Sequence, residues 1–379
     1  MQNRLAFFIV FSVGISALFF SSCSKNMSKD DPLPSVYTPS VFISSQNAFV
    51  YALDPVTSVK KWEFHVTSNV QATPVVYGDY VYVAEEAGNI YKLDLKTGKA
   101  ADTFMLGGQI LATPIISKDT LYVGSSGTMY AVNVNTGITG WSKNIGANLF
   151  SSPTIFDTLV IFGGYDGKVY AQDRVDGVDV WSYTSPSGGN QFYSSPVVSG
   201  NNVYIGGLND GVLYCLSIFD GTMKWTYPTG GGIQSSPIVY GGNVIFGSND
   251  YYLYCVDTAA GFPRWAPINL HDRIVSSPYA YNQLVYVGSY DYNMYAVNII
   301  DGTVKWQFKT GAIIKSSPMV YDAKLYFGSH DKNLYCLDPS NGDMKWKQNI
   351  NGLIECSPSA DNMDGKPTHI ASISGNSIN

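Results

Sequence analysis

Charged residues are scarce in this chain of 379 residues. They make up 14% of it, and 23 Lys and Arg against 29 Asp and Glu give a formal net charge of −6 and a sequence pI near 5.1. No run of Lys or Arg occurs. Nucleic-acid binding requires a basic surface that neutralises phosphates. The composition therefore excludes nucleic acid as a partner.

Residues that bind transition metals are also few. The chain has four His and five Cys, with no Cys-x-x-Cys pair and no cluster of His. Structural zinc sites need several such ligands at close spacing. We therefore predict no metal site.

Long apolar runs are missing as well, because the longest, Leu5–Phe20, has only 16 residues. That is short for a membrane span but typical of the apolar core of a secretory signal. Arg4 precedes the run, and small residues lead into Cys23. The segment resembles a bacterial lipoprotein signal, which implies that Cys23 is lipidated and becomes the mature N-terminus. An uncleaved N-terminal anchor is the alternative.

Three segments follow from this resemblance. Residues 1–22 are the expected lipoprotein signal peptide, residues 23–40 a flexible tether and residues 41–379 a single folded domain. Either interpretation of the N-terminus attaches the protein to a membrane outside the cytoplasm. Ser24, directly after the cysteine, resembles signals for the outer membrane. We expect an outer-membrane lipoprotein of a bacterial cell envelope, facing the periplasm or the surface.

Aromatic and turn-forming residues are abundant. With 28 Tyr, 7 Trp, 37 Gly and 18 Pro, the composition favours an all-β protein. A Ser-Pro or Thr-Pro dipeptide recurs every 39 to 43 residues, and each repeat predicts four short strands with turns between them. Such units are typical of the blades of a β-propeller. The prolines are Pro74, Pro114, Pro153, Pro196, Pro237, Pro278, Pro318 and Pro358.

The count of repeats predicts an eight-bladed β-propeller of four-stranded antiparallel blades. Seven blades run from Pro74 to Trp346, and the eighth must combine both ends of the chain. Leu353–Ala360 is the expected first strand of that blade, and residues 41–62 supply the other three. A second candidate, Thr368–Ser374, competes with Val41–Ser45 for the place of the second strand. The sequence leaves this choice open.

A small residue stands ten positions before each Trp, which predicts that the indole packs against a shallow neighbour. In one blade Lys92 and Asp102 occupy both positions, so the two partners change together. Together with the Asp and Gly between them, these pairs resemble the tryptophan-docking motif of the pyrroloquinoline-quinone (PQQ) repeat family. The pairs are Ala52 and Trp62, Ala131 and Trp141, Ala171 and Trp181, Cys215 and Trp225, Cys255 and Trp265, Ala296 and Trp306, and Cys336 and Trp346.

This resemblance covers roughly residues 41–360 and implies the same eight-bladed propeller. That fold occurs in quinoprotein dehydrogenases and in the propeller lipoprotein of the outer-membrane β-barrel assembly machinery. The dehydrogenases bind PQQ with calcium, often beside a pair of adjacent cysteines and beneath a lid built from large insertions. This chain has no adjacent cysteines, and its largest extension is only Thr184–Phe192. We therefore expect neither PQQ nor calcium.

One segment imitates a hydrolase site, since Ser316 and Ser317 are followed by His330, Asp331 and Cys336. These are repeat positions rather than a catalytic group. Asp331 is expected in the turn between the second and third strands, with His330 beside it. The serines of Ser-Ser-Pro are expected to bond local backbone. Cys336, like the other cysteines opposite a Trp, is expected as a small buried residue without a disulfide.

Side chains that differ between blades mark the candidate site. The residue four positions before each repeat proline is always apolar and is predicted to be core, while its neighbours on the other strand face vary. The resemblance implies that the first strand lines the central channel. The neighbours form either a polar binding funnel or a solvated channel whose charges neutralise one another. The candidate residues at the channel mouth are Phe150, Tyr193, Gln234, Arg273, Lys315 and Glu355.

Three functions are compatible with these observations. The first is a non-enzymatic, membrane-anchored scaffold that binds a protein partner, for example in outer-membrane protein assembly. The second is a propeller that binds a glycan or another small ligand at the funnel, where Phe150 and Tyr193 could stack on sugar rings. The third, a PQQ-dependent dehydrogenase, is disfavoured for the reasons given above.

Overall fold

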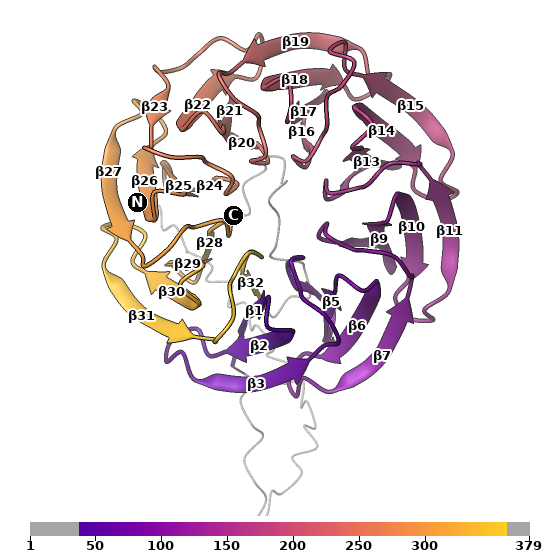
Figure 1. Ribbon diagram of the computed structural model, residues 1–379, viewed down its shortest axis with the longest axis vertical. Helices are drawn as coiled ribbons and strands as arrows, with labels where there is room; N and C mark the ends of the chain where they lie inside the picture. The colour runs from indigo at the N-terminus through magenta and orange to yellow at the C-terminus, as the bar shows by residue number, and fades with distance from the viewer. Residues whose placement is uncertain (1–37, 362–379) are drawn as a thin grey trace, which may run out of the picture. The chain divides into compact units, whose positions relative to one another are not determined.

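The computed structural model describes residues 38–361, which form eight four-stranded antiparallel sheets arranged in a ring (Figure 1). In each sheet the first strand lies nearest the axis and the fourth lies at the rim. The predicted all-β, eight-bladed propeller is confirmed. In this part of the chain, no helix is long and apolar enough to cross a membrane. The expected signal peptide, Cys23 and Thr368–Ser374 lie outside the described residues.

The blades are numbered in the order of their prolines. Blade 1 contains β4 (Val75–Tyr77), β5 (Tyr80–Ala84), β6 (Asn89–Asp94) and β7 (Ala100–Met105); blade 2 contains β8 (Ile115–Ser117), β9 (Thr120–Ser125), β10 (Thr128–Asn133) and β11 (Thr139–Asn144). Blade 3 contains β12 (Thr154–Phe156), β13 (Leu159–Gly163), β14 (Lys168–Asp173) and β15 (Asp179–Thr184); blade 4 contains β16 (Val197–Ser199), β17 (Asn202–Gly206), β18 (Val212–Ser217) and β19 (Met223–Pro228).

The remaining blades follow the same plan. Blade 5 contains β20 (Ile238–Tyr240), β21 (Asn243–Gly247), β22 (Tyr252–Asp257) and β23 (Ile268–Asn269); blade 6 contains β24 (Tyr279–Tyr281), β25 (Leu284–Gly288), β26 (Asn293–Asn298) and β27 (Val304–Lys309). Blade 7 contains β28 (Met319–Tyr321), β29 (Lys324–Gly328), β30 (Asn333–Leu337) and β31 (Met344–Asn349); blade 8 contains β32 (Ser359–Ala360), β1 (Val41–Ser45), β2 (Phe49–Leu53) and β3 (Lys60–His65).

Blade 8 joins the two ends of the described chain, as expected. β1 pairs antiparallel with β32, with Val41 opposite Ala360 and Phe42 opposite Ser359. Val41–Ser45 therefore holds the place of the second strand. The pairing closes the ring and gives the inner edge of β1 a partner, so that it is not left open to other chains.

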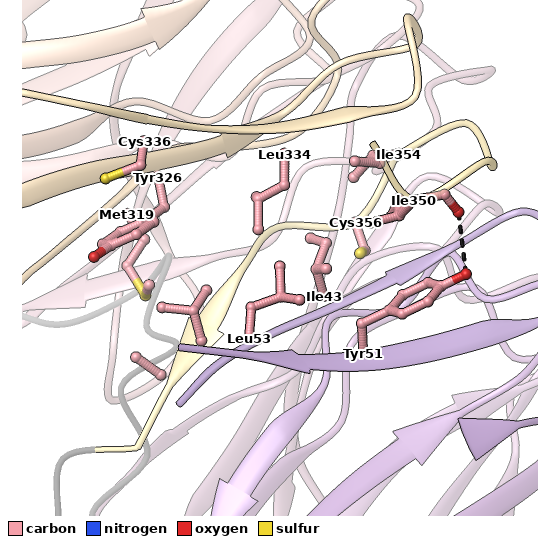
Figure 2. Close-up of a cluster of buried hydrophobic side chains, with 12 residues drawn as sticks. Ile43, Tyr51, Leu53, Met319, Tyr326, Leu334, Cys336, Ile350, Ile354 and Cys356 are labelled. Carbon is pink, nitrogen blue, oxygen red and sulfur yellow. Dashed lines mark hydrogen bonds between the residues drawn. The ribbon is translucent and has the colours of Figure 1, made fainter. Parts of the chain in front are cut away.

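The core beside this closure contains side chains from both ends of the chain (Figure 2). Ile43 and Leu53 of blade 8 pack with Leu334 of blade 7, all fully or almost fully buried. The Tyr51 hydroxyl donates a hydrogen bond of 3.0 Å to the Ile350 carbonyl across the same boundary. Similar apolar clusters lie between other neighbouring blades. The core is thus a set of layers between blades, and it is complete only when the ring is closed.

The predicted tryptophan contacts are confirmed by the strand register. Ala171 lies directly opposite Trp181 in the neighbouring strand. The Trp181 indole N–H donates to the Ile218 carbonyl of the next blade at 2.8 Å. Gly221, which has φ +71°, lies against the indole, and a Cβ there would approach the ring to 2.5 Å. Trp181 therefore needs the small Ala171 opposite it in its own blade and Gly221 in the next.

Blade 5 departs from this pattern at its outermost strand. β23 has only two residues, and Trp265 precedes it, so Cys255 and Trp265 are not paired in regular strands. Pro263 and Pro267 lie on either side of Trp265 and lack the N–H that a regular ladder uses. The Trp265 indole still donates to the Ile299 carbonyl of blade 6 at 3.1 Å. We call the boundary between two neighbouring blades a seam. Trp265 therefore docks across the seam between blades 5 and 6 although it lies outside a regular strand.

In blade 1, Lys92 and Asp102 are opposite each other, as the paired change predicts. The Lys92 ammonium donates to the Val134 carbonyl of blade 2 at 2.9 Å and lies 4.3 Å from the centroid of the Tyr80 ring. In six other seams, an indole N–H of the preceding blade reaches the corresponding carbonyl. Lys92 thus supplies, from the third strand, the donor that a Trp supplies from the fourth.

The seam between blades 4 and 5 uses another donor. The Trp225 indole packs against Gly261 of blade 5, but its N–H is buried without a hydrogen-bond partner among the described residues. The Tyr204 hydroxyl instead donates to the corresponding carbonyl, that of Thr258, at 3.0 Å. The Trp225 indole therefore still packs across this seam, but Tyr204 replaces it as the hydrogen-bond donor to the carbonyl.

The four described cysteines are buried free thiols. Cys215 and Cys336 lie directly opposite Trp225 and Trp346, as predicted. Burial raises the pKa of Cys215, Cys255 and Cys336 to about 12. These thiols therefore stay protonated and act as small core residues.

Candidate functional site

The residue just before each repeat proline forms a ring around the axis. Its backbone N–H donates to the side-chain hydroxyl of the equivalent residue in the next blade, with N to O distances of 2.9 to 3.2 Å, and the last bond returns to blade 1. We call this the hydroxyl ring. It consists of Thr73, Thr113, Ser152, Ser195, Ser236, Ser277, Ser317 and Ser357.

The hydroxyl ring corrects one expectation about Ser-Ser-Pro. The first serine does bond local backbone, since the Ser316 hydroxyl accepts the Gly328 N–H of its own blade at 3.1 Å. The second does not, because the Ser317 hydroxyl accepts the Ser277 N–H of the preceding blade. The two partners are 40 residues apart in sequence. Packing of neighbouring blades brings them together, and only the last bond, from Ser357 to Thr73, depends on closure of the ring.

A cavity of about 130 Å³ lies on the axis, with the hydroxyl ring at its base; we call it the axial cavity. One residue from each blade, three positions before the proline, forms its mouth, and six members of the hydroxyl ring line its depth. Five of the six predicted mouth residues are in this lining. The mouth residues are Gln71, Leu111, Phe150, Tyr193, Gln234, Val275, Lys315 and Glu355.

Arg273, the sixth predicted residue, does not line the axial cavity. It stands five positions before its proline, one alternation further out along the segment than the mouth residues. Its side chain is exposed, and its guanidinium lies 5.1 Å from the centroid of the Tyr290 ring. Tyr290 therefore holds Arg273 outside the mouth of the axial cavity.

An ion pair occupies one side of the mouth. The Lys315 Nζ is 2.6 Å from a carboxylate oxygen of Glu355 in the next blade. Burial alone would raise the pKa of Glu355, but His330 and Lys315 outweigh it and lower that pKa to about 2. Burial alone would lower the pKa of Lys315, but neighbouring groups, Tyr193 and Glu355 among them, raise it. Both groups are therefore charged at neutral pH.

His330 was expected only as a neighbour of the turn residue Asp331. Its backbone is indeed in that turn, but its Nε2 lies 3.5 Å from Glu355 and is buried without a hydrogen-bond partner among the described residues. Asp331 instead accepts the Tyr335 hydroxyl at 2.6 Å and the Gly311 N–H at 2.8 Å. Within residues 38–361, His330 is therefore hydrogen-bonded neither to Asp331 nor to Ser316 or Ser317.

Aromatic rings occupy another side of the mouth. Phe150 and Tyr193 are stacked, with centroids 5.3 Å apart and planes 15° from parallel. Tyr165 packs against Phe150 at 4.7 Å in a tilted arrangement. Burial raises the pKa of Tyr193, so its hydroxyl stays protonated. These rings form an apolar wall.

Three residues near the axis were missed as site candidates: Tyr165, Tyr290 and His330. Each lies two residues after the end of the second strand of its blade, and its backbone N–H donates at 3.0 Å to the carbonyl of the residue five positions before the proline. The signal was present in the sequence, because this position also varies between blades.

The axial cavity does not fit PQQ. Its volume of about 130 Å³ is well below the roughly 300–1,000 Å³ of pockets that enclose drug-sized ligands. PQQ is a fused-ring molecule with several carboxylates, and Glu355 would repel it while holding the only cation of the lining, Lys315. Among residues 38–361, no group of three His, Cys, Asp or Glu is placed to hold a metal ion.

The eight four-stranded blades and the indoles docked between them place this protein in the class of eight-bladed β-propellers. The chain belongs to the family described as outer membrane protein assembly factor BamB, which matches residues 46–267 and 252–355. BamB of Escherichia coli (strain K12) and BamB of Shigella dysenteriae serotype 1 (strain Sd197) are each 31% identical over 119 residues. These matches cover 28% of this chain and 30% of each relative, so they span less than a third of either relative.

Solved structures share the fold. BamB from Moraxella catarrhalis matches with a TM-score of 0.65 and 18% identity over 79% of this chain and 91% of that one. The computationally designed protein Ika8 matches with a TM-score of 0.69 and 14% identity, covering 79% and 95%. A quinohemoprotein alcohol dehydrogenase from Pseudomonas putida HK5 matches with 0.65 and 14%, covering 78% and 69%. At these identities the similarity establishes the fold alone.

Proposed function

We propose that this protein is a non-enzymatic scaffold, anchored in a bacterial cell envelope, that binds a protein of the outer-membrane assembly machinery. The observation that carries the proposal is the family match, which extends over almost the whole propeller. The relatives are named for outer-membrane protein assembly.

The non-enzymatic part of the proposal rests on the chemistry at the axis. The candidate triad is dispersed, since His330 faces Glu355 while Asp331 is bonded to Tyr335 and Gly311. The axial cavity is smaller than pockets that enclose ligands of this size, and its one lining cation, Lys315, is already paired with Glu355. Purified protein mixed with PQQ and calcium should develop neither cofactor absorbance nor dye-linked alcohol oxidation. Either signal would contradict this part of the proposal.

The anchor is proposed at Cys23, as the lipidated N-terminus of the mature protein. The described fold begins at Thr38, where the Lys61 ammonium bonds the Thr38 and Pro39 carbonyls, each at 2.6 Å. Mass spectrometry of the membrane-purified protein should find an N-terminal peptide that begins at Cys23 and carries lipid. An unmodified N-terminal peptide from residues 1–22 would favour the uncleaved anchor.

Site-specific photo-crosslinking in the native membrane tests the scaffold. Ser187 lies in the extension between β15 and β16, and Phe219 lies in the turn between β18 and β19, where it is 68% exposed. Because successive strands run antiparallel, these two positions are on opposite faces of the ring. Gln307 on β27, at the rim, is the matched control.

We expect one face to capture an outer-membrane assembly protein, identified by mass spectrometry. Failure of Ser187, Phe219 and Gln307 alike to capture such a protein would contradict the scaffold proposal. Capture from Gln307 alone would move the contact to the blade edge, where strand addition becomes the mode of binding to test.

A further inference from the structure

The axial cavity places an aromatic wall opposite an ion pair. Phe150 and Tyr193 come from blades 3 and 4, and Lys315 and Glu355 come from blades 7 and 8. In a ring of eight, blade 3 is opposite blade 7 and blade 4 is opposite blade 8 (Figure 1). A guest on the axis therefore meets an apolar surface on one side and fixed charges on the other.

The ion pair of Lys315 and Glu355 favours a guest that carries no net charge. Lys315 and Glu355 are 2.6 Å apart and stay charged at neutral pH. A cationic guest would meet Lys315 and an anionic guest would meet Glu355, each with its countercharge already engaged. Separating a partly buried pair leaves an uncompensated charge, which is costly. A neutral guest that both donates and accepts hydrogen bonds avoids this cost.

The depth of the axial cavity adds further hydrogen-bonding capacity. Six hydroxyls of the hydroxyl ring line it. Each accepts one backbone N–H, and none of them donates a hydrogen bond to another group within residues 38–361. Their O–H groups are therefore free to donate to a guest that carries several acceptor oxygens.

We propose that the axial cavity binds one neutral sugar ring. Adjacent hydroxyls of a pyranose can accept from Lys315 and donate to Glu355, and further ring oxygens can accept from the hydroxyl ring below. The C–H face of the sugar packs on Tyr193 and Phe150. The volume of about 130 Å³ admits a single ring rather than a longer stretch of polysaccharide. This site is independent of the scaffold proposal, so either can fail alone.

Saturation-transfer NMR on the full-length protein, in a detergent without a sugar headgroup, tests the proposal. The probes are methyl pyranosides of glucose, galactose and mannose, with the 6-carboxylate and 6-amino analogue of each. We expect saturation transfer to at least one neutral glycoside, and binding about tenfold or more weaker for both charged analogues of that sugar. No transfer to any neutral glycoside at tens of millimolar would overturn the proposal, and so would equal binding of a charged analogue.

Variants locate the site. Tyr193→Leu and Phe150→Leu remove the aromatic wall, and the double variant Lys315→Met/Glu355→Gln removes both charges without leaving one unpaired. Each should weaken binding of the neutral glycoside about tenfold, with melting temperatures measured to confirm folding. Arg273→Gln, outside the lining, should bind as the unchanged protein does. Full binding by both aromatic variants, or loss of binding in Arg273→Gln, would overturn the assignment to the axial cavity.

Discussion

The seams between blades and the mouth of the axial cavity are built from the same repeat, yet they differ in how strictly the repeat is kept. At the seams, a docked indole recurs with a small residue opposite it and a carbonyl in the next blade. At the mouth, equivalent positions hold eight side chains that range from Leu111 to Lys315. Where every blade must meet the same neighbour, the chemistry repeats; where side chains face an open cavity, it is free to vary.

The seam between blades 1 and 2 shows what the repeat must conserve. The indole is gone, but Lys92 still donates to Val134 across the seam at 2.9 Å. The conserved requirement is therefore a donor for the carbonyl of the next blade rather than an indole. The comparison predicts that seam variants lose stability, while mouth variants mainly change charge and binding.

Removal of one docked indole should have the largest effect. Trp181→Ala deletes a side chain that is 8% exposed and frees the Ile218 carbonyl. We expect a loss of about 3–5 kcal/mol in the free energy of unfolding, as for other large-to-small core changes, measured by urea denaturation. Trp181→Phe, which keeps a ring but no N–H, should lose less. A loss below about 1 kcal/mol in Trp181→Ala would show that seams do not carry the fold.

Acid should next reveal the ion pair at the mouth. The folded pKa of Glu355 is about 2, below its ordinary value of 4.5. Its stabilising contribution is therefore complete above pH 4.5 and is lost as the pH falls toward 2, by on the order of 2–3 kcal/mol. Urea titrations across this range should show a shallower acid loss in Glu355→Gln. Glu63→Gln, in an exposed pair with Lys60, is the control and should follow the unchanged protein.

Loss of the substitute donor at the seam of blades 1 and 2 should have a smaller effect. Lys92→Met keeps the length of the side chain but leaves the Val134 carbonyl without its donor, which should cost about 1–2 kcal/mol. The double variant Lys92→Ala/Asp102→Trp installs the pair found in the other seams. It should be more stable than Lys92→Ala alone in the same urea assay. No recovery would mean that this seam no longer accommodates an indole.

The smallest effect is expected in the hydroxyl ring. Ser277→Ala removes the acceptor of the Ser236 N–H and should cost about 1 kcal/mol. Thermal unfolding measures this against Ser142→Ala, an exposed serine on β11 that should change stability by less than about 0.5 kcal/mol. An equal response of the two variants would argue against a stabilising ring.

Much of the fold could be predicted from the sequence because the repeat encodes it many times. The spacing of the prolines predicts the eight blades, and the joint change to Lys92 and Asp102 identifies a contact that the register confirms. At the site, alternation placed Phe150, Tyr193 and Lys315 at the mouth correctly, although they lie in the segment before the first strand rather than in the strand itself.

The errors at the site concern neighbours that lie in other blades or beyond the first strand. Arg273 alternates in phase with the mouth residues but lies two residues further from the axial cavity, where its guanidinium packs on Tyr290. The partner of His330 is Glu355 of the next blade. Neither contact follows from the order of residues within one repeat.

The sequence by itself determined the class of fold, the number of blades and the seven tryptophans that dock between blades, because these depend on periodicities repeated along the chain. The tertiary structure alone decided that Val41–Ser45 completes blade 8, that the hydroxyls form a closed ring, and that an ion pair faces an aromatic wall. These arrangements join residues about one repeat, half a ring or a whole chain apart. Such residues become neighbours only when the blades pack against one another and, for the two ends of the chain, when the ring closes.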